Sequence, residues 1–563
     1  NFGFVVPDDK NFGTDIFISK SNWGKARNNH KVLVKITKFP EKGKNAEGEI
    51  IEVLGGVNEA GVDMLSLIKQ YELPYKFPDE VVEDAKAFGT KINPEDLSYR
   101  RDLRQDIIFT IDGEDAKDLD DAIHVEKLPN GNYKLDVHIA DVSHYVREKT
   151  ELDKEAYLRG TSIYMLGRVI PMLPRELSNG ICSLNVGEDR YTLSCSMEIT
   201  PNAKIVDSDI YKAVIRVTER MTYTDVQKIL DKSDNEVLKK YEKYISHFEL
   251  MAELANILKN KRRENGYLNL DIPESKIILD ENGFAIDVKK YETYFSNEII
   301  EQFMLIANET VAEKFYWLQA PFIYRNHEAP DLDKVKDLNK TLSNFGYKIK
   351  VSKEDIIYPN EFAKILDDVK GKDEEKVVSN IILRTLRVAK YEAINKGHFG
   401  IASKYYCHFT SPIRRYPDLF IHRIISKYLE HNYNVNEFFI KKYSKRAEKR
   451  ADNCSDRERT ATKVEREAID IKKAEFMEDK IGQEYEGIIS SVTNFGIFVE
   501  LENTVEGLIR YENLGDEYFI YNEESREALG EHTHKVYKIG DKVRIRVAEA
   551  NKILRRIDFE IID

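Results

Sequence analysis

Five aspartates lie within ten positions in the segment TIDGEDAKDLDDAIHV, residues 110–125. Neighbouring carboxylates push one another toward protonation unless positive charge lies among their oxygens. Apolar residues 107–109 precede the segment, and residues 133–141, YKLDVHIAD, alternate apolar and polar side chains like a half-buried strand. We therefore expect the carboxylates to lie between strands and to face a bound cation. The five are Asp112, Asp115, Asp118, Asp120 and Asp121.

Hard oxygen ligands of this kind suit Mg²⁺ or Mn²⁺, which take few carboxylates from the protein and leave substrate phosphates to complete the shell. The segment therefore predicts phosphoryl transfer. A calcium-binding loop is excluded by spacing: the fifth and sixth positions from Asp112 are Ala116 and Lys117, where that loop needs an oxygen ligand and a glycine. An acidic loop exposed to solvent is the alternative, and the apolar flanks argue against it.

The length of 563 residues is too great for one ordinary core and indicates three or four domains. No run of about 18 apolar residues and no signal peptide is recognisable, so nothing indicates a membrane or secretion. The four cysteines have no CxxC spacing and indicate neither a zinc site nor a disulfide framework. A monomer in a reducing cytoplasm is the expectation.

The net charge of −13 is unfavourable for a nucleic-acid binder, because Lys and Arg contacts to phosphate usually dominate such affinity. The distribution of charge is uneven. Residues 441–473 contain 12 Lys and Arg against 7 Asp and Glu, whereas residues 481–563 contain 10 against 17. The chain is therefore acidic with basic tracts, which fits RNA confined to a channel and also fits an ordinary charged helix.

Four segments differ in character along the chain. Residues 1–75 contain short strand-like runs separated by Gly, Pro and Asn, which predict a small β-barrel. Residues 76–100 are a predicted linker, residues 101–480 the predicted catalytic domain with its C-terminal helices, and residues 481–563 a second predicted barrel.

Two helices are predicted inside the catalytic domain. One covers residues 235–261 and ends at Asn265-Gly266, and the other covers residues 297–316. In the N-terminal barrel, aromatic residues are interleaved with lysines, an arrangement that holds single strands by base stacking, although most aromatics of a small barrel form its core. These residues are Phe2, Phe4, Phe12, Phe17 and Trp23, with Lys10, Lys20 and Lys25.

Two long motifs carry a family resemblance. The run IDGEDAKDLDDA followed by HIADVSHYV at 138–146, and the distant segment YYCHFTSPIRRYPDLFIHR at 405–423, resemble the ribonuclease II and ribonuclease R family of 3′→5′ exoribonucleases. The ribonuclease R branch is the more similar. The resemblance implies an α+β multidomain fold, in which a central mixed α/β RNB catalytic domain is flanked by OB-fold β-barrels, cold-shock type at the N-terminus and S1 type at the C-terminus.

The resemblance also implies roles for single residues of the catalytic centre. Asp112, Asp118, Asp120 and Asp121 would hold one or two Mg²⁺ or Mn²⁺ ions, with Asp120 most closely tied to bond cleavage. Arg414 matches an active-site arginine, and the planar guanidinium suits a phosphate because it donates two hydrogen bonds and keeps its proton. The remaining catalytic candidates are Tyr223, near the scissile phosphate, and Glu465, in a long charged helix.

A second set of residues is implied to bind RNA. Tyr164 would clamp the 3′-terminal nucleotide. Where the family has a partner aromatic, this chain has Leu270, with Tyr267 as a candidate substitute. The other candidates are Arg415 and the S1-type residues Phe495, Phe498 and Tyr511, with His534 as a further one.

The function expected from this resemblance is processive 3′→5′ hydrolysis of single-stranded RNA to nucleoside 5′-monophosphates, in RNA decay and quality control. Structured RNA with a 3′ overhang is a further candidate substrate. One alternative is a non-catalytic RNA-binding protein with a degenerate nuclease core, which the intact acidic and arginine motifs argue against. A DNA nuclease is the other, since carboxylate-metal sites cut both polymers.

Overall fold

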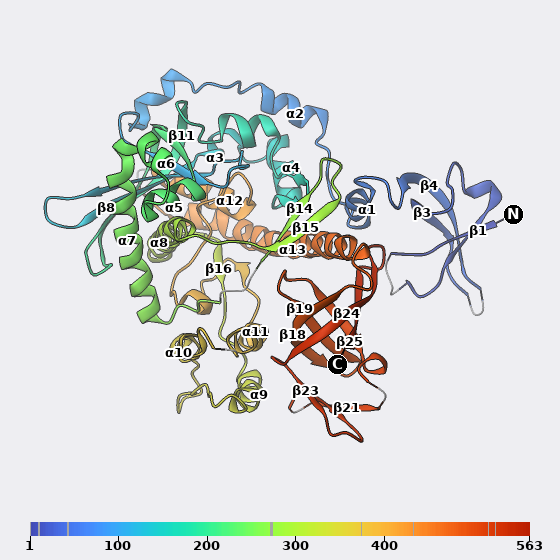
Figure 1. Cartoon of the computed structure of the whole chain (residues 1–563). Coiled ribbons are helices and arrows are strands. Elements are labelled where there is room, and N and C mark those ends of the chain that lie inside the picture. Colours follow the sequence, from blue (N-terminus) through green and yellow to red (C-terminus); the bar gives the residue numbers. More distant parts are fainter. Residues whose placement is uncertain are drawn as a thin grey trace.

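The computed structural model describes residues 2–8, 12–41, 44–270, 274–372, 374–431, 433–515, 517–523 and 525–562. Figure 1 shows an N-terminal sheet domain at one side, a large central domain, and a C-terminal barrel below the long helix α13 (Glu437–Glu478). α13 was expected as a long charged helix, and this is confirmed. It packs against parts of all three regions and therefore acts as their common support.

The N-terminal domain is a four-stranded sheet with the order β1-β2-β4-β3. Ile16 and Ile18 alternate with partly buried neighbours along β2, and with Ala46 they form the small buried core. The elements are β1 (Phe2–Val5), β2 (Ile16–Ser19), η2 (Lys20–Asn22), β3 (His30–Lys38), β4 (Ala46–Gly56) and α1 (Val62–Gln70).

The central domain contains a seven-stranded sheet with the order β13-β6-β7-β8-β11-β12-β5. Its middle strands are antiparallel, whereas β13 pairs with β6 and β5 pairs with β12 in parallel. Asp112 is the last residue of β6 and Asp121 the first of β7, so the expected position of the aspartates between strands is confirmed. The strands are β5 (Arg101–Asp102), β6 (Phe109–Asp112), β7 (Asp121–Lys127), β8 (Tyr133–Ala140), β11 (Asp189–Ile199), β12 (Ile205–Arg216) and β13 (Glu219–Thr222).

Helices cover this sheet and share its core. The predicted helix over 297–316 is confirmed as α8, and the predicted stop at Asn265-Gly266 is the end of α7, where Gly266 has a φ of 95°. The stretch 235–261 is not one helix, because it is interrupted at Tyr241. The helices are α2 (Asp79–Lys86), η3 (Pro94–Tyr99), α3 (Val142–Tyr145), α4 (Glu151–Arg159), η4 (Glu176–Ile181), α5 (Tyr223–Asp231), α6 (Asn235–Lys240), η5 (Glu242–Tyr244), α7 (Ile245–Asn265), α8 (Phe295–Trp317), η6 (Phe399–Ile401) and α12 (Tyr416–Glu430).

Three further helices form a cluster with a core of its own, which includes Phe362, Ile365 and Leu366. These helices were not expected from the sequence. They are α9 (Leu332–Ser343), α10 (Pro359–Val369) and α11 (Glu375–Thr385), and three small two-stranded sheets complete the domain: β9 (Ile163–Met165) with β10 (Arg168–Ile170), β14 (Ser275–Leu279) with β15 (Ala285–Lys290), and β16 (Tyr324–Asn326) with β17 (Lys390–Glu392).

The C-terminal domain is a closed barrel of β18, β19, β20, β25 and β24, with a three-stranded sheet at its side. Among the helices of the described ranges, none has the length and apolar character needed to cross a bilayer. The elements are β18 (Glu484–Thr493), β19 (Gly496–Leu501), β20 (Glu506–Arg510), η7 (Tyr511–Asn513), β21 (Phe519–Asn522), β22 (Glu527–Gly530), β23 (Val536–Lys538), β24 (Lys542–Asn551) and β25 (Arg556–Ile562).

Two ionic contacts fix the terminal domains to α13. Lys472, whose side chain is almost completely buried, lies 2.7 Å from the Asp63 carboxylate of α1. Glu467 accepts a hydrogen bond of 2.6 Å from the Tyr71 hydroxyl and forms an ion pair with Arg555 of the C-terminal domain. The relative placement of the domains therefore depends on α13.

A buried ion pair stabilises the junction of α4 and α12. The Asp153 carboxylate accepts hydrogen bonds of 2.7 Å from both the Arg423 guanidinium and the Tyr416 hydroxyl. Burial alone would raise the pKa of Asp153, but the Arg423 charge and these hydrogen bonds hold that pKa below its usual value. The carboxylate is therefore charged and paired.

We expect Asp153→Ala to destabilise the central domain by about 3–5 kcal/mol, because it leaves the Arg423 charge buried without its partner. A lower transition temperature in differential scanning calorimetry measures this loss. The control is Lys154→Ala, which removes an exposed ion pair to Glu151 and should cost less than about 1 kcal/mol. Equal transitions for both variants would contradict the assignment.

Candidate active site

The loop between β6 and β7 is held in place by backbone contacts on both sides. The Ala140 N–H donates to the Asp120 carbonyl at 2.9 Å, and the Leu119 N–H donates to the Ser183 hydroxyl at 3.1 Å. Apolar Leu119 is buried, which directs its neighbours Asp118 and Asp120 to other sides. The loop is therefore an ordered part of the sheet edge.

Asp120 lies against the second sequence motif. Its Oδ1 accepts a hydrogen bond of 2.8 Å from the Ile413 N–H, 293 positions away, and its Oδ2 lies 3.7 Å from Arg414 Nε. The Arg414 carbonyl in turn accepts the Ser162 N–H at 2.9 Å. The Arg414 side chain remains 42% exposed, so one side of the guanidinium is available to a ligand.

The aspartates are strongly perturbed. Burial, together with the charge of Asp121, raises the pKa of Asp112 to about 8, and burial raises the pKa of Asp121 to about 6. Burial also raises the pKa of Asp120 well above its usual value, against the opposing charge of Arg414. These carboxylates therefore lack enough positive charge around them.

Carboxylate oxygens of this kind suit a divalent cation, although the side chains do not converge on one coordination centre. Asp112 Oδ2 and Asp120 Oδ2 are buried and accept no hydrogen bond. Within the described ranges, no three or more His, Cys, Asp or Glu side chains are grouped so that they could hold a metal ion. The four aspartates expected as ligands thus lie close enough to influence one another's pKa, although they do not form a closed set of metal ligands.

Tyr164 and Glu465 are brought to the same place from β9 and α13. The Tyr164 hydroxyl donates to Asp118 Oδ2 at 3.0 Å, and the Tyr164 N–H donates to Glu465 Oε1 at 2.7 Å. The Tyr164 side chain is exposed, while burial raises the pKa of Glu465. Tyr164 is therefore fixed at both ends beside the aspartates, with its ring accessible.

Tyr223 begins α5 directly after β13, whose residue Thr222 is paired with Asp112 of β6. Burial and the charges of Asp121 and Asp112 raise the pKa of its hydroxyl. On the same strand, Arg220 donates to the Ala116 carbonyl at 2.7 Å, and its charge lowers the pKa of Asp112. Arg220 was not expected at the site, because no local sequence pattern distinguishes it.

Arg415 differs from its neighbour Arg414. It donates a hydrogen bond of 2.8 Å to Asp418, whose side chain is fully buried, and it is only 18% exposed itself. Part of its guanidinium is therefore used inside the protein.

The candidates for RNA binding in the C-terminal barrel have different exposures. Phe495 is exposed, and its ring centroid lies 6.0 Å from that of Phe498. The Tyr511 hydroxyl donates to the Thr493 carbonyl, and its ring stacks on Phe519, so Tyr511 belongs partly to the barrel core. His534 is exposed in the connection between β22 and β23.

In the N-terminal sheet, the rings of Phe2, Phe4 and Phe17 contact one another, and Phe2 and Phe4 are exposed. Lys10 lies outside the described residues. In the central domain, Leu270 packs on the core of α9–α11, and the Tyr267 hydroxyl donates to Glu301 at 2.8 Å.

Three family models match the chain. The RNB domain matches residues 100–431, the cold shock domain residues 4–78, and the S1 RNA binding domain residues 478–562. The chain is 43% identical to Ribonuclease R of Thermotoga maritima, covering 100% of this chain and 79% of that protein, and 42% identical to Ribonuclease R 1 of Lactococcus lactis, covering 100% and 68%.

Among solved structures, the chain superimposes on RNase R of Mycoplasma genitalium in complex with ribose methylated single-stranded RNA. The TM-score is 0.92 at 30% sequence identity, over 99% of this chain and 86% of the other. The fold expected from the resemblance, an RNB domain between cold-shock and S1 domains, is confirmed.

Proposed function

Since the chain belongs to the ribonuclease R family of 3′→5′ exoribonucleases, we propose that it hydrolyses single-stranded RNA to nucleoside 5′-monophosphates with the help of Mg²⁺ or Mn²⁺. The observation that carries this proposal is the pair of buried carboxylate oxygens on Asp112 and Asp120 that accept no hydrogen bond, the second of which lies 3.7 Å from Arg414. Asp112, Asp118, Asp120 and Asp121 are the proposed ligands of one or two ions.

A bound divalent cation would activate a water and offset negative charge on the phosphate. The chain's own residues would do the rest. Arg414 offers the exposed side of its guanidinium to a phosphate oxygen. The hydrogen bond from the Ile413 N–H fixes the Asp120 carboxylate beside Arg414. Tyr164 is held by Asp118 and Glu465, which positions its ring for the terminal base, and Tyr223 lies beside Asp112 for the phosphate.

RNA would reach the site from the terminal domains. Phe495 offers an exposed ring for stacking beside the partly buried ring of Phe498, with Tyr511 and Arg415 as secondary contacts. Contacts to the 2′-OH would select RNA over DNA. The aspartates and Arg414 come from a single chain, which is consistent with a monomer, and the buried free thiols fit a reducing cytoplasm, where RNA decay and quality control take place.

The test uses one RNA labelled at either end. In Mg²⁺ we expect the 3′-labelled RNA to release labelled mononucleotide at once and the 5′-labelled RNA to shorten stepwise, since only a 3′ end reaches the aspartates. EDTA should stop both reactions, and Mg²⁺ or Mn²⁺ should restore them. Internal fragments, or release that is indifferent to EDTA, would overturn the proposal. A DNA strand of the same sequence should remain uncut.

Tyr164 allows a separate test of the proposed stacking. We expect Tyr164→Ala to weaken binding of a short RNA by about 5–150-fold, the usual range for loss of one stacked base, whereas Tyr164→Phe keeps the ring and most of the affinity. Fluorescence anisotropy in EDTA measures binding without cleavage. If the phenylalanine variant lost as much affinity as the alanine variant, the hydroxyl contact to Asp118, and not stacking, would be the role of Tyr164.

A further inference from the structure

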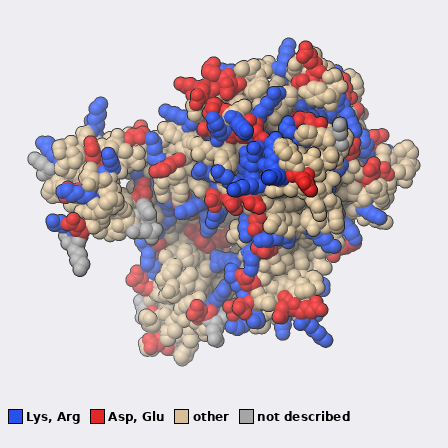
Figure 2. All heavy atoms as spheres, turned by 180° about the vertical axis from the view of Figure 1, so that it is seen from behind, with Lys and Arg blue, Asp and Glu red and all other residues tan. Residues whose placement is uncertain are grey.

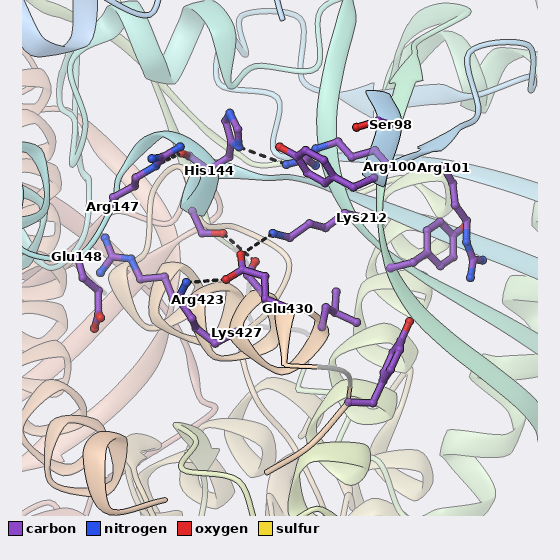
Figure 3. A pocket seen from close by; sticks show the side chains of 16 residues that line it. Ser98, Arg100, Arg101, His144, Arg147, Glu148, Lys212, Arg423, Lys427 and Glu430 are labelled. Carbon is purple, nitrogen blue, oxygen red and sulfur yellow. Dashed lines mark hydrogen bonds and ion pairs between the residues drawn. The ribbon is translucent and has the colours of Figure 1, made fainter. Parts of the chain in front are cut away.

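A large basic cavity lies on the central domain away from the aspartates. Its volume is about 1030 Å³, and its lining comes from β5 and the residues before it, from α3, from β12 and from the second half of α12. Figure 3 shows the side chains that line it. From Arg414 to Lys427 the chain follows α12, whose rise of about 1.5 Å per residue separates the two by roughly 20 Å.

The cavity contains more cations than carboxylates. Two carboxylates line it, Glu148 and Glu430, and Glu148 is already engaged by Arg446 and Arg450 of α13. Figure 2 shows Lys and Arg side chains gathered near the middle of the rear face of this otherwise acidic chain. The lining cations are Arg100, Arg101, Arg147, Lys212, Arg423 and Lys427.

Some of these cations are structural. The buried Arg100 is paired with Asp141 at 2.6 Å, and Arg423 is paired with Asp153. Their side chains are 0% and 6% exposed. Their charges are offset by these aspartates, and they have little freedom to move toward a ligand.

Three further cations line the cavity, and together they carry more positive charge than the one carboxylate beside them offsets. Lys212 and Lys427 share the single carboxylate of Glu430, at 3.2 and 2.6 Å, and both point toward it in Figure 3. Arg147 donates its Nε–H to the His144 carbonyl at 3.2 Å and has no carboxylate within ion-pair distance in the described part of the chain. A concave surface with surplus positive charge concentrates anions.

Aromatic rings lie beside these cations. Tyr99 and Tyr433 both line the cavity and are 55% and 60% exposed. Exposed tyrosine rings next to Arg and Lys are a suitable surface for a base attached to a phosphate. A cavity of this size accommodates a ligand as large as a nucleotide.

We propose that this cavity is a second binding site, for the phosphate of a ribonucleotide, held by Arg147, Lys212 and Lys427 with its base against Tyr99 or Tyr433. The choice of a ribonucleotide rests on the proposed function, because hydrolysis of RNA would release nucleoside monophosphates from the same domain. A phosphate with an attached base is present both in a free mononucleotide and in an RNA strand, at a segment remote from the 3′ end in the catalytic centre.

The test measures binding of fluorescent 5′-AMP while a 2′-O-methylated oligonucleotide, which resists hydrolysis, fills the catalytic centre. We expect one 5′-AMP to bind per chain. Adenosine lacks the phosphate, so its affinity should be lower by about tenfold or more. The double variant Arg147→Ala with Lys427→Ala should weaken 5′-AMP binding by about tenfold or more. The matched control is Lys261→Ala with Arg263→Ala, two exposed residues of α7.

A second arm separates the two sources of phosphate. If the cavity holds a strand, the double variant should bind a 30-nucleotide RNA more weakly while its affinity for an 8-nucleotide RNA is unchanged. The proposal is overturned if filling the catalytic centre removes all 5′-AMP binding and the double variant binds the long RNA like wild type. Because binding and not cleavage is measured, that result would leave the proposed hydrolysis untouched.

Discussion

Asparagine in place of Asp120 is expected to slow RNA cleavage by about 10³-fold or more, while the affinity for RNA stays within a few-fold of wild type. The two side chains have the same shape, and the asparagine Oδ1 can still accept the Ile413 N–H. What is lost is the charge on the second oxygen, which accepts no hydrogen bond and lies 3.7 Å from Arg414. Single-turnover cleavage of 3′-labelled RNA and anisotropy in EDTA measure the two quantities.

The matched control is Asp115→Asn in the same acidic run. Asp115 is exposed, so its replacement should leave both cleavage and binding unchanged. Removing the Asp120 charge also relieves repulsion from Asp121 and Asp118, so the variant should unfold at no lower temperature than wild type. Loss of RNA binding together with cleavage would mean that Asp120 has a structural role.

The aspartate run could be predicted from the sequence because it is contiguous. Asp112 and Asp121 lie at the facing ends of β6 and β7, and apolar residues on either side marked both strands. Arg414 could not be placed there by pattern alone. Its approach to Asp120 depends on backbone hydrogen bonds from Ile413 and Ser162, and only the family resemblance connected the two motifs.

Other features were missed for different physical reasons. The spacing of the apolar residues in α10 predicts a helix, but it does not show that this helix packs with others into a separate core; these residues are Phe362, Ile365, Leu366 and Val369. The interruption at Tyr241 has no comparable signal, because helical residues continue on both sides of it. The basic cavity could not be predicted from the sequence, because its cations come from segments far apart in the chain.

Replacement of Arg414 by alanine is expected to reduce the cleavage rate by about 10²–10³-fold, the usual cost of removing one preorganised donor from a reacting phosphate. Arg414→Lys keeps the positive charge but loses the planar fork, so we expect its rate to lie between alanine and wild type. Binding of RNA in EDTA should change far less than the rate. The control is Arg263→Ala, which removes an exposed ion pair between α7 and Asp367 of α10.

A double variant separates a direct role of Arg414 from an indirect one. If Arg414 and Asp120 act on the same phosphate in one step, Arg414→Ala should slow the Asp120→Asn enzyme much less than it slows wild type. Independent structural effects would instead multiply, and the double variant would be slower by the product of the two losses. The Arg414 and Asp120 side chains lie 3.7 Å apart and form an ion pair between the two sequence motifs. We therefore expect the non-additive result. A wild-type rate for Arg414→Ala would remove the arginine from the mechanism.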